Sequence, residues 1–381
     1  MTHYLLNARF TVPAMAILLS FSASCKKSVH VADKDARLLK NAHAALTLTT
    51  PYNVVNSLPA GYVTDGSVDY THYLQGALDS NSELEFPGFP ILVNDTGLKV
   101  RSNQTITFLP GSELWMKPSS KNTYGVIRMD AVSNVTLNSP VIKGDRYTHL
   151  VTTGEWGMGI LMYSSKDVVI NDARISDCWG DGLYMGRTGA TNQRITIRNI
   201  WCNNNRRNGI SVISVDSLAM ISPYVANTNG ASPASGIDFE PNTSADEMKR
   251  ITVTDPVTRN NGGYGIAFGI DQLLKPSATK NVSATITNHL DSACGKISFV
   301  VSCYRRDSTT TGTVTGSINI VNPDWKNPAT GRAFQFWVTE PTFTGAVSSP
   351  SVMVNNVYKT TAQMQVLFPA WVNDGTCTFT Y

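Results

Sequence analysis

The sequence predicts an all-β fold in which short strands wind into a solenoid with three strands per turn, a parallel β-helix. Three observations predict it. One strand pattern recurs seven times and ends each time in a small polar residue, a second set of strands opens with glycine in phase with the first, and only 15% of the 381 residues are charged. The repeat is too short for propeller blades and lacks the leucine pattern of horseshoe proteins.

The first residues predict an export signal. Arg9 is followed by an apolar stretch from Phe10 to Phe21 that is too short to span a bilayer comfortably, and small residues then lead to Cys25. "SASC" resembles a bacterial lipoprotein signal, with Ser22 where such signals usually carry Leu. We expect residues 1–24 to be a signal peptide and residues 25–60 a flexible tether lipidated on Cys25. Ordinary secretion with an incidental cysteine is the alternative.

We expect residues 61–381 to form a single catalytic domain, monomeric and held in the cell envelope, periplasmic or at the cell surface, with membrane contact only through the lipid. Its first element is a helix over residues 67–81, where Tyr70, Leu74 and Leu78 share a face behind Asp69 as N-cap. The first strand-like run follows in "ELEFPGFPILV".

The first repeated column consists of strands that end at a polar corner, as in "VTLNSPV", "VVINDAR" and "ITVTDPV". Asn and Asp are common at bends, where their side chains satisfy backbone groups, so we expect this column to be structural. The corner residues are Ser139, Asp172, Asn199, Ser222, Asp255, Asn288 and Asn322, with Asn356 as an eighth.

The second column holds the strands that open with glycine. Its members are "GVIRM" (125–129), "GILMY" (159–163), "GLYMG" (182–186), "GISVI" (209–213), "GIDFE" (236–240) and "GIAFG" (265–269). Side chains alternate along a strand, so the second and fourth residues, which are apolar except for Arg128, are expected to point inward and the third and fifth outward.

This architecture resembles the pectate-lyase-like right-handed parallel β-helix proteins, a superfamily dominated by polysaccharide-degrading enzymes. The resemblance covers roughly residues 65–360, including the helix that would cap the N-terminal end, and it implies a carbohydrate-active enzyme. The polygalacturonase branch carries Asn-Thr-Asp, Asp-Asp, Gly-His-Gly and Arg-Ile-Lys motifs, none of which occurs here. The layout is closer to that of tailspike-type and exopolysaccharide depolymerases, which place Asp and Glu on neighbouring coils.

Asp238 and Glu240 are the strongest catalytic candidates, because they occupy the outward positions of "GIDFE" beside a coil with small outward residues. Their Cα atoms would lie about 6.6–7 Å apart. Asp181, two coils away, is the candidate third acid. Glycoside hydrolysis needs one protonated and one ionised carboxyl group, and separations of about 6.5–9.5 Å imply inversion. The leading hypothesis is an inverting glycoside hydrolase with these three acids as catalytic residues.

Further residues near the same edge could bind a sugar, whose C–H face stacks on aromatic rings and whose hydroxyl groups need acceptors. We expect the substrate-binding residues to be Arg146, His149, Glu155, Trp156, Trp179, Tyr184 and Tyr264. Trp325, Trp337 and Trp371 are expected to serve packing or end-capping.

Two other functions stay open. A polysaccharide lyase acting on a uronate polymer would need a base and a cation, and its groove carboxylates could hold Ca²⁺. Its candidate residues are Arg146, His149, Tyr184, Arg187 and Arg207. A non-catalytic glycan-binding β-helix is the other alternative. The hydrolase hypothesis needs no metal or other cofactor.

The charge balance and the cysteines exclude other classes of site. The chain has 31 Lys and Arg residues against 28 Asp and Glu residues, and no run of basic residues. It therefore lacks the excess of positive charge that is typical of nucleic-acid-binding proteins. After Cys25 five cysteines remain at irregular spacing without a CxxC motif, which predicts neither a zinc site nor a disulfide framework. The expected partner is therefore a polysaccharide.

Overall fold

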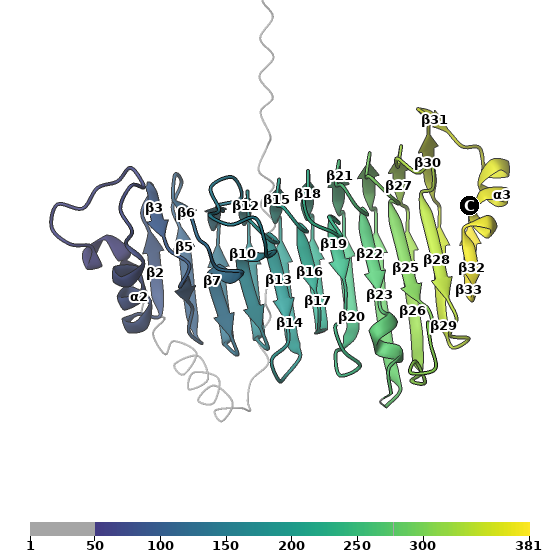
Figure 1. Ribbon diagram of the computed structural model, residues 1–381, viewed down its shortest axis with the longest axis horizontal. Coiled ribbons are helices and arrows are strands. Elements are labelled where there is room, and N and C mark those ends of the chain that lie inside the picture. The colour runs from purple at the N-terminus through teal and green to yellow at the C-terminus, as the bar shows by residue number, and fades with distance from the viewer. Residues whose placement is uncertain (1–49, 277) are drawn as a thin grey trace, which may run out of the picture. The chain divides into compact units, whose positions relative to one another are not determined.

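The computed structural model describes residues 50–276 and 278–381, and residues 50–381 form one unit, a right-handed parallel β-helix (Figure 1). Three sheets run along its length, and each coil contributes one strand to each sheet. All strand pairs within the described residues are parallel except that of the last two strands of one sheet. The predicted signal peptide and Cys25 lie outside the described residues.

In the described part of the chain, the first sheet has twelve strands. They are β1 (Tyr52–Asn53), β2 (Glu83–Phe86), β5 (Gln104–Phe108), β8 (Ser133–Asn138), β11 (Lys166–Asn171), β14 (Asn192–Arg198), β17 (Val215–Ile221), β20 (Met248–Thr254), β23 (Lys280–Thr287), β26 (Val314–Val321), β29 (Phe343–Ser348) and β33 (Thr376–Thr380).

The second sheet has eleven strands among the described residues. They are β3 (Pro90–Val93), β6 (Glu113–Met116), β9 (Val141–Lys143), β12 (Arg174–Ser176), β15 (Trp201–Asn203), β18 (Tyr224–Ala226), β21 (Val257–Arg259), β24 (Leu290–Ser292), β27 (Asp324–Lys326), β30 (Ser351–Val354) and β31 (Val357–Tyr358).

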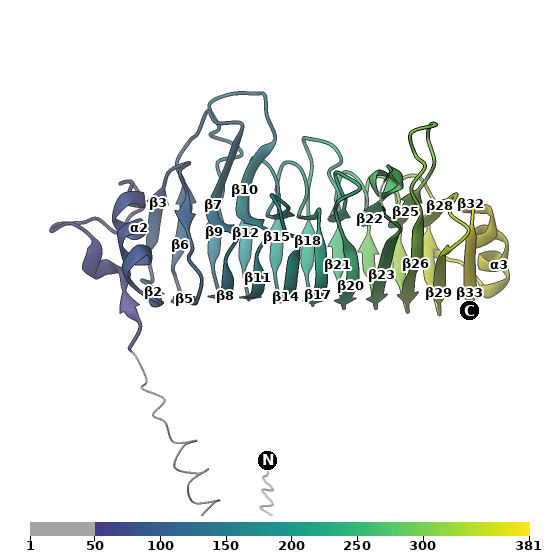
Figure 2. The same cartoon turned by 90° about the horizontal axis from the view of Figure 1, so that it is seen from below.

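The third sheet, which carries the site described below, has ten strands within residues 50–276 and 278–381. They are β4 (Leu98–Lys99), β7 (Thr123–Asp130), β10 (Trp156–Tyr163), β13 (Leu183–Gly186), β16 (Ile210–Val212), β19 (Ile237–Phe239), β22 (Ile266–Gly269), β25 (Phe299–Cys303), β28 (Phe334–Val338) and β32 (Val372–Asp374). Figure 2 shows short, even turns along one edge of the solenoid and loops of unequal length along the other.

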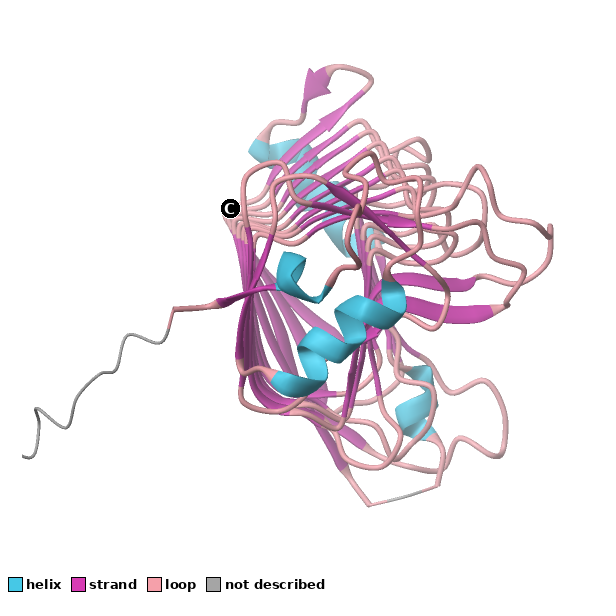
Figure 3. Ribbon diagram, turned by 90° about the vertical axis from the view of Figure 1, so that its left-hand side faces the viewer, coloured by secondary structure: helices cyan, strands magenta, loops and turns pink. Residues whose placement is uncertain are grey.

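Helices close both ends of the stack. The helix α2 (Thr71–Ser80) lies across the N-terminal end, as Figure 3 shows, and buries Leu74 and Leu78 as predicted. Asp69 accepts a hydrogen bond from the Thr71 amide, although the residue that caps the helix backbone is Tyr70. At the other end α3 (Thr361–Ala370) begins with a capping box between Thr360 and Gln363. No helix in the described residues is long and apolar enough to cross a membrane.

The β-helix begins within the segment predicted to be the tether, residues 25–60. β1 pairs with β2, and the 3₁₀ helix η1 (Val54–Ser57) follows it with Val54 fully buried. Residues 52–57 therefore belong to the first coil.

The polar corner column is structural, as predicted. Its seven residues from Ser139 to Asn322 all have φ between 51° and 57°, the left-handed region that Asn and Asp tolerate better than most residues. Some corner side chains also bond across coils, as Asn199 does to Asp172 at 2.9 Å. Asn356 is not the eighth corner, because Ser349 holds that position. Asn355 and Asn356 instead form the positive-φ turn of the antiparallel β30–β31 hairpin.

The glycine-led column forms the third sheet. Its second and fourth residues line the core, and Phe239 stacks on Phe268 of the next coil at 4.1 Å. Glycine is required where coils approach closely, because a Cβ at Gly236 would lie 2.6 Å from the carbonyl oxygen of Gly265. The predicted register was wrong by one residue in the first segment. Ile127 pairs with Ile160, so Arg128 points outward and pairs with Asp130 at 3.0 Å.

Candidate active site

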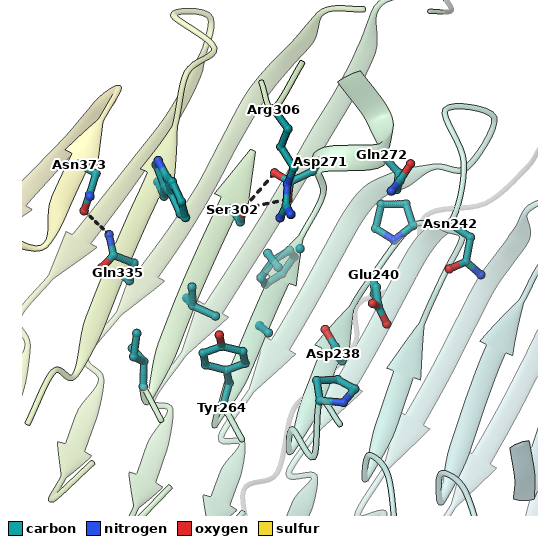
Figure 4. Close-up of a pocket in the computed structure, with 18 of the residues that line it drawn as sticks. Asp238, Glu240, Asn242, Tyr264, Asp271, Gln272, Ser302, Arg306, Gln335 and Asn373 are labelled. Carbon is teal, nitrogen blue, oxygen red and sulfur yellow. Dashed lines mark hydrogen bonds and ion pairs between the residues drawn. The ribbon is translucent and has the colours of Figure 1, made fainter. Parts of the chain in front are cut away.

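A groove runs over the outer face of the third sheet. Its larger hollow, of about 660 Å³, and its smaller one, of about 310 Å³, share Glu240 and Asn242 in their walls. The smaller hollow lies over the strands before β19, where Trp156 and Tyr163 line it, and the larger extends over the strands after β19 to Trp337. The two hollows therefore adjoin at Glu240 and Asn242, and together they are called the groove below. Figure 4 shows residues that line the larger hollow.

Asp238 and Glu240 project into this groove because of strand alternation. Ile237 and Phe239 of β19 are fully buried in the core, so the residues between and after them face outward. In the strand register, Asp238 lies opposite Ser211 of the preceding coil and opposite Ala267 of the following coil. The small side chain of Ala267, together with Gly269, forms the floor of the larger hollow.

The two acids have different surroundings. Asp238 is only 4% exposed and has no ion pair among the described residues, and its one recorded hydrogen bond, from Asn208, is long at 3.4 Å. Burial, and then the charge of Glu240, raise the pKa of Asp238 to about 8. The Glu240 side chain is 41% exposed and accepts a hydrogen bond from Arg207 at 3.1 Å. One carboxyl group is thus protonated near neutral pH, while the other is in an ion pair.

Asp181 does not line the groove. It is fully buried and accepts hydrogen bonds from Arg207 Nη1 and from the backbone N–H of Asn208, both at 2.9 Å. Arg207 thus extends from Asp181 to Glu240, with its own side chain 10% exposed. This position does not fit the predicted role of Asp181 as a catalytic partner, because Asp181 reaches the groove only through Arg207.

Four of the predicted substrate-binding residues line the groove. Glu155, Trp156 and Tyr184 lie in the wall of the smaller hollow, and Tyr264 in that of the larger. Trp156 is 45% exposed, which leaves its ring free to stack on a sugar.

The other three do not line it, because the loop after β9 folds back on the solenoid. The His149 ring is fully buried, bonded to Asp145 at 2.8 Å and stacked on Trp179 at 4.2 Å. Trp179 is only 8% exposed, and the Arg206 guanidinium lies 3.8 Å from the centre of its ring. Arg146 donates to the backbone carbonyls and side chains of Asn204 and Asn229. These contacts brace the loop.

The structure also brings residues to the groove that the sequence did not assign to it. Trp337, predicted to serve packing, is 39% exposed, packs against Tyr304 with the two rings tilted by 41°, and lines the larger hollow, whereas Trp325 and Trp371 are buried as predicted. Asp271, at the start of the 3₁₀ helix η2 (Asp271–Leu274), accepts hydrogen bonds from Ser302 and Arg306 in the same wall. Figure 4 shows Asp271, Ser302 and Arg306 in the wall that also carries Glu240 and Tyr264.

Neither metal-site clusters nor disulfides occur in the described residues. No group of three or more His, Cys, Asp or Glu side chains there is arranged to hold a metal ion. Cys178, Cys202, Cys294 and Cys303 are free and buried, and Cys377 is free and partly buried. Of the residues considered as the base or the cation of a lyase, Arg187 is held by Asp246 at 2.8 Å, while Tyr184 and Arg207 line the groove.

Comparison with known proteins supports the fold. The structure superposes on the tailspike of Escherichia coli bacteriophage HK620 (TM-score 0.53, 13% identity, 82% of this chain and 63% of that one). It superposes on the surface adhesin PfbA of Streptococcus pneumoniae (0.52, 10%, 87% and 99%). It also superposes on a 1,3-α-1,4-β-D-galactose-4-sulfate-3,6-anhydro-D-galactose-2-sulfate 4 galactohydrolase (0.51, 11%, 73% and 71%). At these identities the likeness establishes the fold alone.

Curated relatives in sequence carry no functional name. The chain is 28% identical over 188 residues to the prophage-derived uncharacterized protein YorA of Bacillus subtilis, covering 44% of this chain and 32% of YorA. It is 26% identical over 271 residues to uncharacterized YclG of the same species, covering 62% of this chain and 43% of YclG. The matched region thus spans less than half the length of either relative. No protein-family model matches the chain.

Proposed function

We propose that this protein cleaves glycosidic bonds of a polysaccharide bound along the groove of the third sheet. One observation carries the proposal. Asp238 on the outer face of β19 and Glu240 directly after that strand both line a groove with aromatic side chains on both sides, and of the two only Glu240 is paired with a cation. A protonated acid beside an ionised one is the pair that glycoside hydrolysis requires.

In this mechanism Asp238 is the general acid. Its pKa of about 8 keeps it protonated at neutral pH, ready to protonate the leaving glycosidic oxygen. Glu240, oriented by Arg207, activates the attacking water. We propose that the reaction inverts the anomeric centre, with Glu240 activating water rather than forming a covalent intermediate, and the stereochemistry of the first product tests this.

The polysaccharide-acting proteins among the structural neighbours support a carbohydrate role at the level of fold. One is named a galactohydrolase, and the HK620 tailspike was solved in complex with a pentasaccharide. PfbA is named an adhesin, so the same solenoid also suits a surface protein that binds without cleaving. Fold alone does not decide between these functions.

Reducing-end release from a polysaccharide panel tests the proposal. We expect Asp238→Asn and Glu240→Gln each to lower the rate by at least about 100-fold while leaving binding and the far-UV spectrum unchanged. NMR of the first product gives the stereochemistry. Full activity in both variants excludes this pair as the catalytic residues. A product absorbing near 235 nm identifies the lyase instead, and binding without cleavage identifies the glycan-binding protein.

We also propose that residues 1–24 direct export and that Cys25 carries the lipid. Cys25→Ser should move the protein from the membrane fraction to the soluble fraction without loss of activity in lysates. Equal fractionation of both forms excludes the anchor.

A further inference from the structure

We propose that Arg332, Gln335 and Trp337 form a subsite for an anionic sugar residue, one that carries a carboxylate or a sulfate. This inference deepens the proposed function and rests on it, since it assumes that a glycan chain lies in the groove. The three side chains all line the larger hollow. They lie on or directly before β28, so the strand ladder sets their distance from the catalytic pair.

The register gives that distance. Asp238 pairs with Ala267, Ala267 with Val300, and Val300 with Gln335, so Gln335 lies three coils from Asp238 on the same outward column. At 4.8 Å per coil the separation is about 14 Å along the solenoid axis. A sugar at Gln335 would thus belong to the same glycan chain as the scissile bond, several residues away from it.

Arg332 is the group that specifies charge. It is partly buried, donates to the Gln335 side-chain oxygen, and has no carboxylate partner within the described residues. Gln335 is 7% exposed and in turn donates to Asn373, as Figure 4 shows. Neutral groups thus hold the guanidinium of Arg332, and its charge has no carboxylate partner in the described residues. An arginine held in this way suits a carboxylate or a sulfate, because its N–H groups can donate two parallel hydrogen bonds to two oxygens of such an anion.

The other cations in and beside the larger hollow have different partners. Arg306 is paired with Asp271 at 2.8 Å, and Lys275 donates to Thr309 at 2.8 Å. Arg207, at the junction of the two hollows, is shared between Asp181 and Glu240. Of the two arginines that line the larger hollow, Arg332 is thus the one without a carboxylate partner in the described residues, and Lys275 is the other cation there with a neutral hydrogen-bond partner.

Trp337 supplies the stacking surface for the same sugar. It lies two residues after Gln335 on the same face of β28, is 39% exposed, and is supported from below by Tyr304, with ring centres 4.5 Å apart. An exposed aromatic ring beside an arginine binds the apolar face of a sugar while the guanidinium binds its charged substituent.

The test measures binding with the non-cleaving Asp238→Asn protein as background. The probes are polygalacturonate, alginate, hyaluronate and carrageenan as acidic polymers, with dextran and galactomannan as neutral ones. We expect binding to at least one acidic polymer, weakened about tenfold to 100-fold by Arg332→Gln. Arg259→Gln, on the exposed face of the second sheet, is the matched control and should leave binding unchanged. Circular dichroism and thermal melts confirm that both variants fold.

Chemical modification of the bound polymer identifies which anion is recognised. Carboxyl reduction of the bound polymer should remove the difference between the Arg332→Gln protein and its parent if a uronate is recognised, and desulfation should do so if a sulfate ester is. Binding to neutral polymers alone, to none of the acidic ones, or equally by parent and Arg332→Gln proteins overturns the subsite.

Cleavage separates this inference from the proposed function. If a polymer binds through Arg332 but the wild-type protein does not cleave it, the hydrolase proposal fails and the subsite stands. If a neutral polymer is cleaved in an Asp238-dependent way that Arg332→Gln leaves untouched, the hydrolase stands and the subsite fails.

Discussion

Arg207 Nη2 donates to Glu240 Oε2 at 3.1 Å, while Nη1 of the same guanidinium is held by buried Asp181 at 2.9 Å. The cation thus connects the interior of the solenoid to the groove. Because Asp181 fixes Arg207, Arg207 in turn fixes the position of Glu240. Asp238, two residues earlier on the chain, has no such partner, and this asymmetry underlies the first two predictions.

Replacing Arg207 should damage stability and activity by separate routes. Arg207→Gln leaves the Asp181 carboxylate buried without its cation, which we expect to cost about 3–5 kcal/mol in the free energy of unfolding. The double variant Asp181→Asn/Arg207→Gln should recover most of that loss in denaturant unfolding. It should not recover activity, because Glu240 remains unanchored. A double variant with wild-type turnover would contradict a role for Arg207 in the groove.

Activity should fall as the pH rises above about 8. Asp238 must be protonated to act as the acid, and since its pKa is raised to about 8, each further pH unit should lower kcat/KM about tenfold. Measurement of kcat/KM from pH 5 to 10 checks this decrease above pH 8. In Asp238→Asn the residual kcat/KM should not show the decrease. A wild-type profile that stays flat to pH 10 argues against Asp238 as the acid.

Asp291 should make stability depend on pH, with no effect on activity. It is fully buried in the core, and burial raises its pKa to about 6, against hydrogen bonds led by that from Thr258. The folded state therefore holds a proton that the unfolded state releases above pH 4. Its contribution to stability is complete below pH 4 and is lost as the pH rises toward 6, by about 3 kcal/mol at 1.36 kcal/mol per pKa unit.

Asp291→Asn isolates this effect from that of buried His289, whose pKa is lowered to about 3 by the same desolvation and which acts in the opposite direction. The variant should match wild type at pH 4 and exceed it by up to about 3 kcal/mol at pH 7.5, as measured by urea unfolding. A constant difference between the two proteins at all pH values would show that Asp291 does not titrate in this range.

Filling the groove at Gly269 should block substrate without unfolding the protein. A Cβ there meets nothing within 4 Å, and the residue lines the larger hollow, so Gly269→Trp should weaken polymer binding at least tenfold with a small change in Tm. Gly209→Ala is the contrasting control. Its Cβ would lie 1.9 Å from a Val225 methyl carbon, so it should lower Tm markedly. Unchanged binding in Gly269→Trp would show that the substrate lies elsewhere.

The sequence predicted those features that repeat from coil to coil. The polar corners were visible as a recurring Asn, Asp or Ser at the end of a strand, and the outward direction of Asp238 and Glu240 follows from strand alternation. The capping helix was predicted from the helical spacing of its apolar residues. The glycine pattern did not predict the outward position of Trp337, because its segment begins with Ala333 and not with glycine. The segment "AFQFW" (333–337) keeps the same alternation of buried and outward residues, and could have revealed it.

Loop residues could not be placed in the same way. His149 and Trp179 stack on each other only because the loop after β9 folds back, and no periodicity encodes its path. Arg207 lies just before β16, and its reach from Asp181 to Glu240 depends on three different coils. Contacts between turns of unequal length are set by tertiary packing, so they become visible only in the folded chain.

The constant step between coils means that distances between groups on the outer face change along the solenoid axis in fixed increments. Every inserted or deleted coil between β19 and β28 would move Arg332 and Trp337 by one step of about 4.8 Å relative to the carboxylates, and would leave the local chemistry at both ends intact. If the groove binds and cleaves a glycan as proposed, adding or removing coils would change how many sugar units lie between the anionic unit and the scissile bond, without altering the residues at either position.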